Sequence, residues 1–299
     1  MATAKAARML RMEQPGLALR SWQLVRRYPV VPGAILAALV VCAIFAPLVS
    51  PHDPGKRDLR LQDIPPAWMK EGDRAYLLGT DNQGRDVLSR ILYGARISLL
   101  VSAIAVTVGL GAGTASGLLA GYFGGFTDEA IMRLVDLWSA IPFLLLALVV
   151  AVTAGPSLIT VILLLAFAGW SAGARNIRGE VLAVKTRDYV AFARLSGASH
   201  LRVMIRHILP QVLHVILVIT TLRTGGLIIA EAGLSFLGVG VPASTPTWGV
   251  MIGEGQRFLL TNWWQSIFPG VAISLTVVSM NFIGDWLRDY FDPHLRQTR

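Results

Sequence analysis

Residues 188–210 read DYVAFARLSGASHLRVMIRHILP, and they separate two apolar runs that are each long enough to enter a bilayer. The stretch is polar and basic, and it opens the second apolar run at a proline. Asp188 can cap a short helix, Gly197 can end that helix in a left-handed conformation, and Ser199 can cap the next one. The pattern predicts two short helices joined by a sharp bend on one side of a membrane.

The composition around this stretch is that of a membrane protein. The 299 residues are 54% hydrophobic and 15% charged, with a mean hydropathy of +0.58, whereas soluble domains carry about a quarter charged residues. The net charge of +9 would also suit nucleic acid, but the Lys and Arg residues flank the apolar runs, as membrane orientation requires. We therefore expect a lipid membrane and no nucleic acid as partner. The single cysteine, Cys42, excludes an internal disulfide.

Six apolar segments predict an all-α membrane protein with six transmembrane helices, since about 20 apolar residues cross a bilayer. They lie at about 30–50, 97–120, 131–153 and 157–174, from about 208 onward, and at about 266–284. The basic 1–29 tail and the basic loop 175–207 predict that the N- and C-termini are both cytoplasmic. The first segment is interpreted as an uncleaved anchor. The predicted divisions are the tail 1–29, the first helix 30–50, an external connection 51–96, the transmembrane core 97–284 and the tail 285–299.

The connection 51–96 carries eight basic and seven acidic residues, and this near-neutral balance fits the external side. Thr80 and Gln83 have the spacing of a capping box, in which each side chain accepts from the other's backbone. Apolar residues then recur on one face. We expect an interfacial helix that leads into the second transmembrane helix.

Glycines recur at every fourth position of the second segment. Such a stripe lets another helix approach closely, so we interpret it as a packing face without chemistry. In the third segment, Pro142 predicts a kink. The four glycines of the stripe are Gly109, Gly113, Gly117 and Gly121.

Two charged residues of the fifth segment, Arg223 and Glu231, are candidates for the translocation path, because ionisable groups within spans are usually functional. They are eight residues apart and share a face if the helix is continuous. In the alternative interpretation, Arg223 extends its guanidinium to the interface and Glu231 stands in water.

Catalytic and metal-binding motifs are missing from the sequence. It has no GxxxxGK[ST] phosphate-binding loop, no HExxH and no cysteine cluster, and its five histidines are scattered. We expect that the chain is not an enzyme and binds neither a metal nor a cofactor itself.

The 188–210 stretch resembles the cytoplasmic coupling motif of ABC importer permeases, which reads Glu-Ala-Ala, three residues, Gly, nine residues, then Ile-x-Leu-Pro. Gly197, Leu209 and Pro210 match its spacing. The sequence departs from it at 191–193, where Ala-Phe-Ala stands for Glu-Ala-Ala, and at His207, which stands for Ile. The resemblance implies that the following residues contact an ATPase: Asp188, Ala191, Phe192, Ala193, Arg194, Gly197, Ala198, Arg202, His207, Leu209 and Pro210.

Further motifs extend the resemblance over nearly the whole chain. LGTDNQGRDVLSRILYGARISL, GYFGG with MRLVD, LSFLG, TPTWG and GDWLRDYFDP occur in this order, and PPAW at 65–68 matches as well. Together they resemble the C-type permease subunit of bacterial dipeptide and oligopeptide ABC importers. The resemblance implies a type I ABC importer permease fold in the bacterial cytoplasmic (inner) membrane. It also implies a heterodimer with a second permease subunit, two ABC ATPase subunits that bind ATP and Mg²⁺, and an external substrate-binding protein.

The predicted function is therefore that of the membrane permease subunit of an ATP-driven peptide importer. A related importer of nickel, glutathione, opines or another small solute shares these motifs and stays an alternative. A secondary transporter is a more distant one, because it needs ion sites in broken helices near the midplane and the spans hold few ionisable groups.

Overall fold

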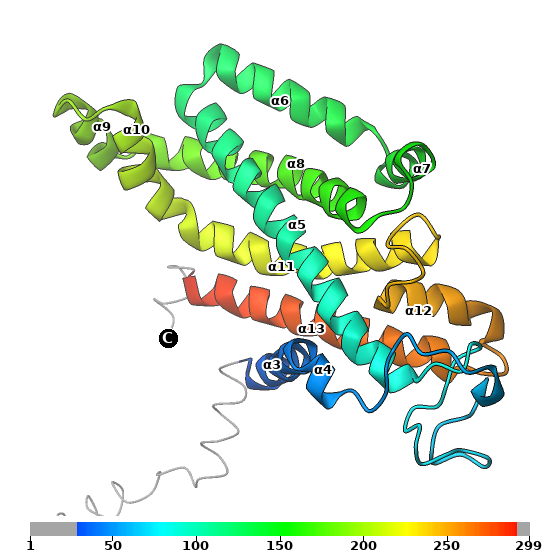
Figure 1. Ribbon diagram of the computed structural model, residues 1–299. Coiled ribbons are helices and arrows are strands. Elements are labelled where there is room, and N and C mark those ends of the chain that lie inside the picture. Colours follow the sequence, from blue (N-terminus) through cyan, green and yellow to red (C-terminus); the bar gives the residue numbers. More distant parts are fainter. Residues whose placement is uncertain (1–28, 292–299) are drawn as a thin grey trace, which may run out of the picture.

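The computed structural model describes residues 29–291, and within that range the chain folds almost wholly into helices (Figure 1). The predicted tail 1–29 therefore lies outside the described residues except for Pro29, and the tail 285–299 is described only to 291. Apart from one isolated bridge between Thr80 and Asp86, residues 29–291 contain no strand pairing. The helices are α3 (Val30–Ile44), α4 (Ala46–Val49), α5 (Val87–Phe123), α6 (Gly125–Ala140), α7 (Phe143–Ala154), α8 (Leu158–Lys185), α9 (Asp188–Leu195), α10 (His200–Val203), α11 (Leu209–Phe236), α12 (Trp248–Gly255) and α13 (Trp264–Phe291).

Four helices within residues 29–291 are long and apolar enough to cross a membrane. They are α5, α8, the continuous run His200–Phe236 and α13, and the pair α6 and α7 adds a fifth if it is one bent span. The helix α3 is apolar but has only 15 residues, which rise about 22 Å against a hydrocarbon core of about 30 Å. The all-helical membrane class is confirmed, whereas six crossings stay a prediction.

The third predicted span is broken rather than kinked. The axes of α6 and α7 differ by 80° at Ile141 and Pro142. Pro142 cannot donate a backbone hydrogen bond and disfavours helical geometry in the residue before it, and Ile141 is extended. The helix therefore ends at Ala140 and restarts in a new direction, as Figure 1 shows beside α8.

The second span begins earlier than expected, because α5 is one helix of 37 residues from Val87. Its N-cap is Asp86, whose carboxylate accepts from the backbone N–H of Ser89 at 2.9 Å. The predicted capping box at Thr80 and Gln83 is wrong, since the Thr80 hydroxyl instead donates to the Leu61 carbonyl. Between residues 50 and 86 the structure contains no α-helix, and the expected boundary at residue 96 falls inside α5.

The most extensive helix contact of the structure is the seam between α5 and α8. The glycine stripe lies along it. A Cβ added at Gly109 would stand 2.3 Å from the carbonyl oxygen of Ala166, and one at Gly117 would stand 2.6 Å from that of Ala174. At Gly113 and Gly121 the nearest atoms, of Trp170 and Val181, would both stand 2.8 Å away. Any side chain at these positions would force the two helices apart.

Candidate coupling loop and far-end pocket

The α9–α10 loop, here residues 188–210, lies at one end of the helix bundle (Figure 1). Helix α9 begins at Asp188, but the N-cap is Arg187 with an extended backbone. Asp188 makes no capping hydrogen bond, so its predicted role as the cap is wrong. As the first helical residue it still places a negative charge near the positive end of the helix dipole.

The bend of this loop has the geometry that its glycine predicts. Gly197 has a φ of +79°, and the Ala198 N–H donates to the Ala193 carbonyl at 3.1 Å while the Gly197 N–H donates to Arg194 at 3.0 Å. This pattern closes a helix through a left-handed residue. Ser199 then caps α10 by accepting from the Arg202 N–H at 3.4 Å.

One face of the loop is buried and the other is exposed. Val190, Val203 and Ile208 pack with residues of α5 and α8 in one core cluster. On the outer face, Phe192 is 66% exposed and Leu195 is 83% exposed. Exposed apolar side chains of this size are typical of a surface that contacts another protein or a membrane.

The last turn of α5 anchors the loop, which the sequence reasoning missed. The Tyr122 hydroxyl is hydrogen-bonded to Nδ1 of His200 at 2.9 Å. The guanidinium of Arg194 lies 5.6 Å from the centre of the Tyr122 ring, within cation–π range. Tyr122 therefore contacts both short helices at once.

The transition into α11 contains a π-helical turn, Met204–Ile208. The Leu209 N–H donates to the Met204 carbonyl, five residues back. Pro210 follows at the start of α11 and has no N–H to donate. His207 lies within this π turn.

The two charged residues of α11 have different surroundings. Glu231 is 0% exposed, accepting from the Ser235 hydroxyl at 2.8 Å and from the Ser98 hydroxyl at 3.1 Å. The alternative in which Glu231 stands in water is thus wrong. Arg223 lies midway along α11 and is exposed, so the two side chains do not share a surface.

Four charges form a buried cluster at the far end of the bundle, opposite the α9–α10 loop, where Figure 1 shows α12 and the start of α5. Arg85 bonds to Oδ2 of Asp81 at 2.6 Å and to Oε2 of Glu254 at 2.9 Å. Arg90 bonds to the same two oxygens at 2.5 and 2.8 Å. The four side chains, called the four-charge cluster below, are at most 22% exposed, and their charges sum to zero.

The four-charge cluster fastens three parts of the chain together. Asp81 and Arg85 belong to the connection before α5, Arg90 belongs to α5, and Glu254 belongs to α12. The connection is also held by the Trp264 indole, which donates to the Thr80 carbonyl at 3.0 Å. Asp81, Arg85 and Arg90 were visible in the sequence only as part of a motif, and the more distant Glu254 has no spacing signal that links it to them.

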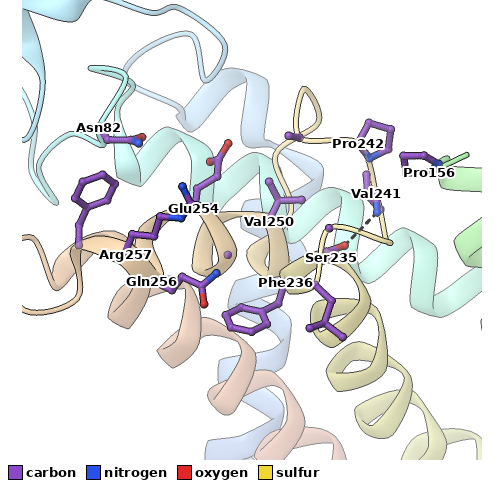
Figure 2. A pocket seen from close by; sticks show the side chains of 15 residues that line it. Asn82, Pro156, Ser235, Phe236, Val241, Pro242, Val250, Glu254, Gln256 and Arg257 are labelled. Carbon is purple, nitrogen blue, oxygen red and sulfur yellow. Dashed lines mark hydrogen bonds between the residues drawn. The ribbon is translucent and has the colours of Figure 1, made fainter. Parts of the chain in front are cut away.

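A pocket of about 730 Å³ adjoins this cluster, between the end of α11, the following segment and α12 (Figure 2). Its volume is typical of small-molecule sites. The charged residues of its lining are Glu254 and Arg257, and the apolar lining includes Phe236, Val241 and Val250. Within residues 29–291, no group of three or more His, Cys, Asp or Glu side chains is placed to hold a metal ion.

Residues 113–297 match the family described as the binding-protein-dependent transport system inner membrane component. Residues 26–66 match the N-terminal transmembrane domain of oligopeptide transport permease C. The first match covers more than half of the chain, so the chain belongs to that family of permeases. It is a transport component rather than a catalytic one.

Curated relatives align over most of their length. The dipeptide transport system permease protein DppC of Escherichia coli K12 is 43% identical over 89% of this chain and 89% of its own. The di/tripeptide transport system permease protein DppC of Pseudomonas aeruginosa is 39% identical over 93% of this chain and 92% of its own. The DppC protein of Haemophilus influenzae is 40% identical over 88% of both chains.

Proposed function

We propose that this chain is the membrane permease subunit of an ATP-driven importer of dipeptides and short oligopeptides. The observation that carries the proposal is the α9–α10 loop, whose buried face is part of the bundle and whose exposed face carries Phe192 and Leu195. The family membership and the names of the relatives support a peptide as cargo.

In this proposal the chain pairs with a second permease subunit, and the α9–α10 loop docks on a cytoplasmic ATPase that binds ATP and Mg²⁺. A substrate-binding protein meets the far end of the bundle on the external side. Nucleotide and loaded binding protein would then shift the population between inward-facing and outward-facing states. The loop, both termini and the ATPases would share the cytoplasmic side of the inner membrane.

The translocation path would pass Arg223. An arginine exposed midway along a spanning helix needs water or a partner group beside it, and a water-filled path between two permease subunits supplies that environment. Glu231 would support the wall of the path from inside, because its hydrogen bond with Ser98 joins α11 to α5.

The test is uptake of labelled peptides by cells that lack and then regain this chain together with its partner subunits. We expect uptake of labelled Ala-Ala to return with the chain and to stop when the ATPase loses its nucleotide-binding lysine. Uptake of labelled nickel or glutathione without uptake of Ala-Ala would instead favour the alternative cargo. ATP-independent uptake of any of these solutes would contradict an ATP-driven importer.

A further inference from the structure

The pocket at the far end contains a fixed negative group. Oε2 of Glu254 accepts hydrogen bonds from both arginines of the four-charge cluster, from Arg85 at 2.9 Å and from Arg90 at 2.8 Å. Among the hydrogen bonds formed within residues 29–291, none reaches Oε1 of the same carboxylate. Two hydrogen bonds from guanidinium groups to one oxygen fix the orientation of this carboxylate. Glu254 is therefore an oriented carboxylate with one free acceptor atom in the pocket wall.

A positive group stands one helical turn further along. Arg257 lines the same pocket, is exposed, and makes no ion pair within the described part of the chain. Residues three apart on a helix have Cβ atoms about 5–6 Å apart, and Figure 2 shows both side chains among the pocket residues. An extended peptide spans about 3.5 Å per residue, so the charged ends of a dipeptide are separated by about 7 Å. The Cβ separation is slightly shorter than the dipeptide, and the long Arg257 side chain can make up the difference.

The other lining residues are mostly apolar, and the polar side chains among them are Asn82, Ser235 and Gln256. Phe236, Leu237, Val241 and Phe258 surround the pocket, and such surfaces accept many side chains. A site that fixes the two charged ends and leaves the side chains in apolar surroundings matches molecules whose ends are constant and whose side chains vary. Free dipeptides have this chemistry.

We propose that this pocket binds a short peptide in transit, with Oε1 of Glu254 accepting from its terminal ammonium and Arg257 pairing with its terminal carboxylate. This rests on the proposed function, because it assumes that peptides reach the far end of the bundle. The cluster then has a second role besides fastening α12, since Arg85 and Arg90 hold the receiving carboxylate in place.

The experiment uses the complete complex of permeases and ATPases in nanodiscs, without the binding protein. The probe is the dipeptide of alanine and the photoreactive residue p-benzoylphenylalanine, and adducts are located by mass spectrometry. We expect adducts within residues 235–258, and we expect Ala-Ala to compete about tenfold better than N-acetyl-Ala-Ala, because acetylation removes a charge-assisted hydrogen bond. In Glu254→Gln and in Arg257→Gln the adduct yield should fall about tenfold.

Matched variants separate binding from folding. Glu71→Gln and Arg74→Gln make the same charge changes at exposed positions outside the pocket, and their adduct yield should equal the wild type. Asp81→Asn perturbs the four-charge cluster without changing a residue of the pocket lining. Its adduct yield therefore measures the effect of disturbing the cluster alone. If Glu254→Gln fails to assemble, Arg257→Gln still tests the pocket, because Arg257 is not in the cluster.

Three outcomes would overturn the assignment. Adducts found elsewhere, while cells that carry the full system take up labelled Ala-Ala, would place the peptide site outside this pocket and leave the proposed function intact. Equal competition by Ala-Ala and N-acetyl-Ala-Ala would remove the role of Glu254. No uptake of labelled peptide by cells that carry this chain with all its partner subunits would remove the proposed function, and this inference with it.

Discussion

The two ends of the bundle differ in how deeply their charged residues are buried. At the far end, Asp81, Arg85 and Arg90 are buried against one another and against Glu254. Near the other end, the pair of Asp128 and Arg178 is half-buried and that of Glu129 and Arg133 is mostly exposed. The α9–α10 loop there leaves Phe192 and Leu195 uncovered. The far end pairs four charges with one another within the chain, whereas the loop end leaves apolar side chains on a surface suited to a separate subunit.

The sharpest test of this contrast is whether the two ends lie on opposite sides of the membrane. With Cys42 replaced by alanine, single cysteines are placed at Lys56 and at Ser196, which are both exposed. An impermeant thiol reagent should label the Lys56 site in intact cells and the Ser196 site only after lysis. Labelling of Ser196 but not of Lys56 in intact cells would reverse the proposed orientation.

The next largest effect is expected from breaking the four-charge cluster. Asp81→Ala leaves Arg85 and Arg90 buried with one carboxylate between them, and removing one partner of a buried pair costs about 3–5 kcal/mol. The solubilised complex should lose that stability in thermal unfolding and accumulate poorly in cells. Glu129→Ala, the matched change at the exposed pair, should cost less than about 0.5 kcal/mol. Equal effects of the two substitutions would contradict the contrast between the ends.

A smaller effect is expected from disrupting the contact between α5 and α8, which runs between the two ends of the bundle. Gly113→Leu places a side chain 2.8 Å from the Trp170 carbonyl, and such overpacking costs about 1–3 kcal/mol. Assembly of the complex, followed by size-exclusion chromatography, should decrease. Gly111→Leu is the control two residues away, where nothing lies within 4 Å. Indistinguishable assembly of the two variants would mean that α5 and α8 are not closely packed.

The smallest change in stability is expected at the bend of the α9–α10 loop. Gly197→Val puts a β-branched residue at a φ of +79°, a strain of about 1–3 kcal/mol that the exposed loop can relieve locally. The complex should assemble, yet ATP hydrolysis stimulated by peptide-loaded binding protein should fall together with uptake. Gly179→Val, in α8 with open space around it, should leave both unchanged. Normal stimulation in Gly197→Val would show that the loop only connects α8 to α11.

Local patterns in the sequence predicted local features well. The four-residue spacing of the glycines predicted a packing face, and these glycines do lie against α8. Gly197 followed by Ser199 predicted the bend between the two short helices of the loop. Both depend on rules that act within a few residues. The capping residues were misassigned at Thr80 and Asp188 because several polar residues near a helix start can cap it, and only the backbone conformation decides among them.

Features that depend on distant residues could not be found in the same way. Glu254 joins Arg85 across 169 positions, and no periodicity links them. Glu231 looked solvent-accessible because it lies near the end of its apolar segment, but α5 covers it and supplies Ser98 as a partner. The 80° break at Pro142 was underestimated because a proline marks a weak point, while the direction of the following helix depends on what it packs against.

The length of α5 has a consequence for how the molecule moves. Its 37 residues rise about 55 Å, well beyond the hydrocarbon thickness of about 30 Å. Its first turn holds Arg90 of the cluster, and its last turn holds Tyr122, which contacts both short helices of the loop. A continuous helix behaves as a rigid rod, so a tilt imposed at one end displaces the other end at the same moment. Spin labels near the two ends of α5 should therefore keep a constant separation throughout the transport cycle, while their distances to the neighbouring subunit change together.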